Sequence, residues 1–198
     1  MPDPTFKIDG TTILSKSGTN VLWGSGAPPG MVLEQFLLPC TEQSITVQSG
    51  TYTSQNVTTT QVTRHDDWDD VTGSSITYTP PSGAQLVIYK FVLQIGISDI
   101  HIIPGFRFML GGAEANKFRT NLEGEYRNGR EVFEFPLLIG GSDDATIGRQ
   151  ATWTTGVVLK MQVKSDQNND ATLHQMDAYD DSGTDQFVPP IIGITAIA

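Results

Sequence analysis

Residues 73–89, GSSITYTPPSGAQLVIY, decide the fold class because they contain a complete strand–turn–strand unit. In Ile76-Thr77-Tyr78-Thr79, apolar and polar residues alternate with the period of two that is typical of a strand with one buried face. Pro80-Pro81-Ser82-Gly83 is a turn signal, since proline fixes φ and glycine permits the bend. Leu86-Val87-Ile88-Tyr89 is an uninterrupted apolar run, which indicates a strand covered on both sides.

The same alternation of strands and turns extends from residue 31 to residue 198. Turn signals such as Gly111-Gly112, Arg127-Asn128-Gly129 and Asp181-Ser182-Gly183 separate the apolar segments. The best helical candidate, 113–122, is short and surrounded by strands. We therefore expect an all-β sandwich of two sheets, of jelly-roll type. The expected strands are 32–38, 44–47, 52–63, 75–79, 85–95, 100–110, 116–125, 131–139, 150–163, 171–179 and 191–197.

Composition and charge limit the classes of partner. The chain has 198 residues, enough for one domain with an appendage, and its 22 acidic and 12 basic residues give a net charge of −10. Such a surface repels phosphate, so we expect neither nucleic acid nor a membrane as a partner. No apolar run approaches the ~20 residues of a membrane helix. The first residues lack the pattern of a secretory signal, and we expect synthesis in a host cytoplasm.

Residues 1–30 differ from the remainder of the chain. Residues 1–22 contain too few apolar side chains for a core of their own, and residues 23–30, WGSGAPPG, mark a boundary. Two interpretations stay open, a flexible tail or an arm that becomes ordered on a partner. We expect an arm and linker at 1–30 and one domain at 31–198. The arm residues expected to contact a partner are Phe6, Ile8, Ile13, Leu14, Val21 and Leu22.

No catalytic, cofactor or metal motif is found. Cys40 follows Pro39 without a neighbouring base, so we expect a partly buried structural thiol. His65, His101 and His174 belong to no metal motif, and His101 is expected to face outward from a strand. We therefore expect a protein that is not an enzyme.

The acidic segment 64–70 places four carboxylates around Trp68. Oxygen ligands suit Ca²⁺, but the spacing of a regular calcium loop is missing. A solvated loop with Trp68 packed as a lid is the favoured interpretation.

One strand carries more apolar residues than one buried face requires. Tyr89, Phe91 and Leu93 share one face, while Ile88 and Val92 lie on the other. Such a strand needs additional cover, either a second subunit or a segment of the same chain, and we favour the subunit. The residues expected at a trimer interface are Tyr89, Phe91, Leu93, Phe106, Phe108 and Trp153.

Three stretches carry a resemblance to a known family. Residues 68–89 join a strand ending in Thr-Pro to one of the Val-Ile-Tyr type, residues 189–198 read PPIIGITAIA, and the chain starts with Phe6-Lys7-Ile8-Asp9-Gly10 before a Ser/Gly-rich stretch. Together they resemble virion proteins of tailed phages, especially cyanophages, that carry a C1q/TNF-like trimeric jelly roll. Ala196 departs from the pattern, since the family's last strand usually closes with Glu.

The resemblance implies a homotrimer with the sheet of each protomer packed around the axis. Such trimers serve as capsid cement or decoration proteins and as fibre tips. We expect a cement protein on the outer capsid surface that binds the major capsid protein through the arms. The alternative is a receptor-binding tip of a head or tail fibre. A secreted TNF-like ligand and a glycan depolymerase are less favoured.

Overall fold

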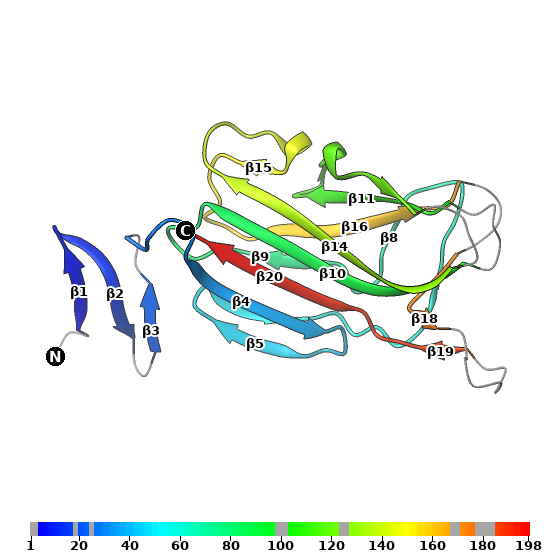
Figure 1. Cartoon of the computed structure of the whole chain (residues 1–198), viewed down its shortest axis with the longest axis horizontal. Helices are drawn as coiled ribbons and strands as arrows, with labels where there is room; N and C mark the ends of the chain where they lie inside the picture. The colour runs from blue at the N-terminus through cyan, green and yellow to red at the C-terminus, as the bar shows by residue number, and fades with distance from the viewer. Residues whose placement is uncertain are drawn as a thin grey trace.

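The computed structural model describes residues 4–17, 20–23, 26–97, 103–122, 127–166, 171–176 and 185–198. Over these residues the chain is all-β, with two short 3-10 turns, η1 (Asn116–Phe118) and η2 (Ala145–Ile147), and no α-helix. The strands curl into a two-layered body, and a small separate sheet lies beyond one end of it (Figure 1).

The first layer is a sheet built on four long antiparallel strands, with shorter strands at its margins, one of which pairs in parallel. In spatial order its long strands are β14 (Arg127–Ile139), β10 (Leu86–Ile97), β20 (Ile191–Ile197) and β4 (Val32–Pro39). The short strands of this sheet are β15 (Arg149–Gln150), β17 (Thr172–Leu173) and β7 (Gln61–Val62).

The second layer faces the first and is also antiparallel. Its order is β12 (Ala113–Glu114), β11 (Gly105–Leu110), β16 (Val157–Lys164) and β8 (Asp69–Asp70), with β13 (Thr120–Asn121) beside β11 and β9 (Ile76–Tyr78) beside β16. The remaining strands form small units: β5 (Ser44–Val47) with β6 (Gly50–Thr53), β18 (Gln175–Met176) with β19 (Gln186–Phe187), and β1 (Thr5–Ile8), β2 (Thr11–Ser17) and β3 (Asn20–Trp23).

Aromatic rings fill the space between the two layers. Tyr89 of β10 lies 5.1 Å from Phe108 of β11, and Phe106 lies 4.8 Å from Phe133 of β14, measured between ring centroids. These side chains are buried or nearly so. Each contributes on the order of 2 kcal/mol through removal of its surface from water.

A buried carboxylate joins β4 to the second layer. Glu34, with 7% of its surface exposed, accepts hydrogen bonds from the Tyr78 hydroxyl at 2.6 Å and from the Ser49 hydroxyl at 2.6 Å and backbone N–H at 2.9 Å. Burial, and then the hydrogen bond and negative charge of Glu34, raise the pKa of Tyr78 far above its usual value, so this phenol remains a donor. The network fixes one end of the sandwich.

Gly193 allows β4 and β20 to approach closely. A Cβ atom at this position would lie 2.6 Å from Leu37 Cδ1 and 2.8 Å from the Phe36 carbonyl oxygen. Any larger residue at position 193 would therefore push β4 away from the sheet.

Pro136 lies in β14, at an edge of the first layer. Strand β15 pairs only with Leu138 and Ile139. The Leu138 N–H donates to Gly148 on the side away from β10, and backbone groups two residues apart point the same way. Position 136 therefore has no donor to offer at this edge, since proline lacks an N–H.

The N-terminal strands form a sheet that the sequence analysis did not foresee. Ile8 pairs with Thr11, and between them Asp9 has φ +49° and Gly10 has φ +81°. Positive φ at both central residues is the geometry of a type I′ hairpin turn, for which Asp-Gly is a preferred pair. The Asp9-Gly10 dipeptide was the signal that could have predicted this hairpin.

The strand predictions are confirmed for most long segments and wrong at four places. Strands β5 and β20 have the expected bounds. The expected strand at 52–63 is two separate strands, β6 and β7, and 116–125 contains η1 and β13 instead of one strand. At 150–163 the long strand β16 begins only at Val157, and 171–179 contains two short strands, β17 and β18. These segments are rich in polar residues and carry no clear period of two.

We predict that Glu34→Ala lowers the free energy of unfolding by ~3 kcal/mol, because Tyr78 and Ser49 would keep buried donors without an acceptor. Urea denaturation followed by tryptophan fluorescence measures the change. The matched control is Glu134→Ala, which removes an exposed partner of Lys90 and should cost less than ~1 kcal/mol. Equal effects of the two substitutions would contradict the role given to Glu34.

Candidate interaction surface

The outward face of β14, β10, β20 and β4 is largely apolar. The register places Leu86 beside Leu138 and Ile197, and Val92 beside Val132 and Ile191. Because directly paired residues in antiparallel strands point to the same side, these apolar residues form continuous rows across the sheet. We call this surface the outer apolar face; it comprises Val32, Leu37, Leu86, Ile88, Val92, Val132, Pro136, Leu138, Ile191 and Ile197.

Several side chains of the outer apolar face are open to solvent in the single chain. Leu37 is 53% exposed, Val132 52% and Val32 46%. Single exposed apolar residues are common, so it is the arrangement in rows across one sheet that makes this face a candidate interaction surface.

One ion pair crosses the outer apolar face. Lys90 Nζ lies 2.7 Å from Glu134 Oε1, on paired positions of β10 and β14. The two charges neutralise each other locally, so the face has no charge excess at this point. The pair is exposed and contributes little stability, but an approaching molecule must match its position.

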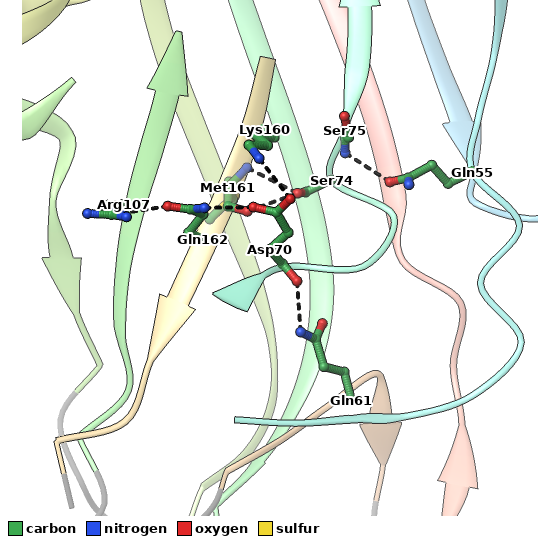
Figure 2. A network of polar contacts seen from close by, with 9 residues as sticks. All are labelled: Gln55, Gln61, Asp70, Ser74, Ser75, Arg107, Lys160, Met161 and Gln162. Atoms are coloured by element: carbon green, nitrogen blue, oxygen red, sulfur yellow. Dashed lines mark hydrogen bonds and ion pairs between the residues drawn. The ribbon is translucent and has the colours of Figure 1, made fainter. Parts of the chain in front are cut away.

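The outward face of the second layer is polar by contrast. Asp70 accepts hydrogen bonds from Lys160 and Gln162, both at 2.7 Å, and Gln162 accepts one from Arg107 (Figure 2). Gln61 extends the network by donating to the Asp70 carbonyl at 2.8 Å. Polar side chains that satisfy one another in this way are suited to contact with water, and the outward faces of the two sheets therefore differ in polarity.

The region around Trp68 is held together by charge pairing. The Arg107 guanidinium lies 4.5 Å from the Trp68 ring centroid, within the range of a cation–π contact. Glu114 joins Arg107 to Arg119, and the hydrogen bond and charge of Arg119 hold the pKa of this carboxyl below its usual value. Asp69 lies 3.6 Å from Arg64.

These contacts bear on the calcium hypothesis for residues 64–70. Asp66, Asp69 and Asp70 each have a basic partner, His65, Arg64 and Lys160 respectively. Within the part of the chain that the structure describes, no group of three or more His, Cys, Asp or Glu residues could hold a metal ion.

The six side chains expected at a trimer interface lie in the interior of one protomer. Their exposed fractions range from 0% to 5%. Large aromatic residues fill the space between the sheets, and the smaller aliphatic residues of β10 point outward. In this fold a subunit interface would use the outer apolar face instead. The six are Tyr89, Phe91, Leu93, Phe106, Phe108 and Trp153.

The residues expected in the arm lie in the β1–β3 sheet. Phe6 and Ile8 are 55% and 54% exposed, Ile13, Leu14 and Leu22 are partly buried, and the side chain of Val21 lies outside the described residues. Strand β2 is the central strand of this sheet and is paired on both sides.

Hydrogen bonds attach the base of the arm to the end of β20. The Gly30 N–H donates to the Ala198 carbonyl at 2.6 Å, and the Ala198 N–H donates to the Met31 carbonyl at 2.9 Å. Residues 30 and 31 are therefore fixed beside the row of Val32 and Ile197, where the outer apolar face ends.

Cys40 is completely buried, and its thiol donates to the Gly73 carbonyl at 3.3 Å. Burial raises the pKa of Cys40 to about 12, which keeps the thiol protonated and unreactive near neutral pH. The expectation of a structural thiol agrees with this position.

Two of the three histidines fall within the described residues. His65 pairs with Asp66, and His101 lies outside the described residues. His174 is buried, with φ +63°, and its Nε2 lies 2.9 Å from the Thr72 hydroxyl. Burial lowers the pKa of His174 to about 4.

Comparison with known proteins gives no match, either among protein-family models or among curated proteins. None of the described helical turns is long and apolar enough to cross a membrane.

We predict that stability falls as the pH is lowered from about 6.5 to about 4. The unfolded state takes up a proton at His174 near pH 6.5, whereas the folded state does so only near pH 4. The neutral form thus stabilises the fold above pH 6.5, and ~3 kcal/mol of this contribution is lost by pH 4. Urea titrations at several pH values give the free energy of unfolding of the wild type and of His174→Gln. The difference in this free energy between the two proteins should shrink as the pH falls. A difference independent of pH would contradict the role given to the neutral form of His174.

Proposed function

We propose that this chain is a non-enzymatic structural protein of a virus particle. In this proposal it assembles as a homotrimer through the outer apolar face and sits on the outer surface of the capsid as a cement protein. Its N-terminal arms bind the major capsid protein. The observation that carries the proposal is the outer apolar face, because a lone protomer leaves it exposed to water.

The strand order supports a jelly roll of the C1q/TNF type. Successive strands alternate between the two layers: β9 lies in the second, β10 in the first, β11 in the second and β14 in the first, followed by β16 in the second and β20 in the first. Such crossing from sheet to sheet is typical of jelly-roll connectivity. A threefold axis is favoured by the resemblance of residues 68–89 and 189–198 to trimeric phage proteins.

The arm suits attachment to a large assembly. The β1–β3 sheet has exposed apolar side chains, and a small sheet without a covering layer is marginally stable by itself. Three arms on one trimer would engage one shell at once, so weak individual contacts would combine into firm attachment. Because β2 is already paired on both sides, a strand of the capsid protein would have to join at β1 or β3.

We predict that the wild type sediments as a trimer of the 21.5 kDa chain and that Val132→Glu sediments as a monomer at micromolar concentration. The substitution buries an unpaired charge in the interface, at a cost of ~3 kcal/mol per contact. The matched control is Val158→Glu, on the outward face of the second layer, where Val158 is 39% exposed. This variant should remain trimeric. A wild type that is monomeric at micromolar concentration would refute the proposed assembly.

We also predict that removing residues 1–25 leaves a soluble trimer that no longer binds virus particles. The truncation removes the β1–β3 sheet but keeps the bonds between residues 30 and 198. Co-sedimentation with particles that lack this protein measures binding. Undiminished binding would exclude the arm from attachment. The number of copies of the protein per virus particle separates the two candidate roles. Many copies would indicate a cement protein, and a few copies would indicate a fibre tip.

A further inference from the structure

His174 lies at the junction between the first layer and the small unit formed by β18 and β19. Its backbone N–H donates to the Gln94 carbonyl of β10 at 2.7 Å, and its carbonyl accepts from the Val188 N–H at 2.9 Å. The backbone of His174 has φ +63°, a left-handed conformation that costs free energy for a residue with a Cβ atom. The junction therefore needs a further contact to hold this residue in place.

The imidazole ring supplies that contact, and its neighbours determine where its proton lies. Gln61 donates to the Asp70 carbonyl (Figure 2), and its Oε1 accepts from the Thr72 N–H at 2.8 Å and from the Thr72 hydroxyl at 3.1 Å. Because the hydroxyl gives its single hydrogen to Gln61, it accepts from His174 Nε2, 2.9 Å away. The neutral ring therefore carries its proton on Nε2 and a lone pair on Nδ1.

The Nδ1 atom of His174 is buried and has no hydrogen-bond partner in the described part of the chain. The groups that bond to His174 are all uncharged. A proton added at Nδ1 would create a buried charge whose N–H meets no acceptor. Charged residues of the surrounding elements are bound to other groups: Asp70 to Lys160, Arg64 to Asp69, Asp185 to Gln175, and Lys90 to Glu134.

The β18–β19 unit itself buries little surface. Gln175 is partly buried, whereas Met176, Gln186 and Phe187 are exposed. Segments with few buried apolar side chains open locally at a low cost in free energy. The hydrogen bonds of His174 to Gln94, Val188 and Thr72 therefore matter more for the attachment of this unit than single bonds do in the core.

We infer that His174 is an acid-sensitive switch, which holds the β18–β19 unit against β10 while the ring is neutral and releases the unit when the ring is protonated. In the open unit the ring contacts water and has its ordinary pKa near 6.5, whereas burial in the closed unit lowers the pKa to about 4. The open form therefore binds the proton more tightly, and lower pH favours opening. The equilibrium constant for opening should be about 30-fold larger at pH 5 than at pH 7.5.

Hydrogen exchange followed by NMR on the whole chain tests the inference, after correction for the intrinsic effect of pH on exchange. We expect the His174 and Val188 amides to lose about 30-fold of their protection between pH 7.5 and pH 5. They should exchange faster than the amides of β10 and respond little to low urea concentrations, because local opening exposes little surface. Protection independent of pH, or exchange in step with β10, would overturn the inference.

His174→Gln removes the titration and keeps an N–H that can donate to Thr72. In this variant the protection of the Val188 amide should differ by less than about threefold between the two pH values. The control is His65→Gln, at a histidine that pairs with Asp66 near the surface, and it should keep the wild-type pH dependence. A pH dependence that persists in His174→Gln would contradict the role of this ring.

The wild-type ring offers a test that needs no variant. Nitrogen chemical shifts of the His174 imidazole should show the neutral form with the proton on Nε2 in the closed protein at pH 5. A protonated ring in the closed protein at this pH, or a neutral ring with its proton on Nδ1, would overturn the inference. Neither result bears on the proposed trimer, since the switch operates within one protomer.

Discussion

Strand β10 is apolar on both faces, and the arrangement of the other strands depends on covering both of them. Its inward residues, Tyr89 and Phe91 among them, pack between the two layers and are completely buried. Of its outward residues, Ile88 is partly buried and Val92 is buried within the protomer. The outward apolar residues of the neighbouring strands β14 and β4, such as Val132 and Leu37, are more exposed, and they make this face the candidate interaction surface.

The outward faces of the two layers differ in polarity. The second layer satisfies its outward polar side chains internally, through the Asp70, Lys160 and Gln162 contacts shown in Figure 2. The first layer pairs Lys90 with Glu134 on an outward face that is otherwise largely apolar. The buried Glu34 links the layers through Tyr78, which keeps β4 in place as the outermost long strand of the apolar surface. This asymmetry makes the outward face of the first layer the candidate interaction surface.

The sequence predicted the fold class well because strands with clear alternation or continuous apolar runs leave a strong pattern, as in residues 73–89. It could not decide which face of β10 points inward, since both are apolar. The aromatic residues were assigned to a subunit interface, but their size makes them the filling of the core. Leu37 and Val132 became part of the candidate surface only once the register was known, because their rows join strands that are far apart in the chain. The arm hairpin was missed although Asp9-Gly10 signals it.

Pro136 affects how copies of this protein can associate through the edge of the first layer. A long strand at the margin of a sheet invites a neighbour to extend the ladder of main-chain bonds, and repeated extension produces open filaments. The missing N–H at position 136 removes the edge donor next to the residues that β15 pairs, so a strand added to β14 could not continue its ladder up to β15. Growth by lateral strand addition is thus discouraged at this end of the β14 margin.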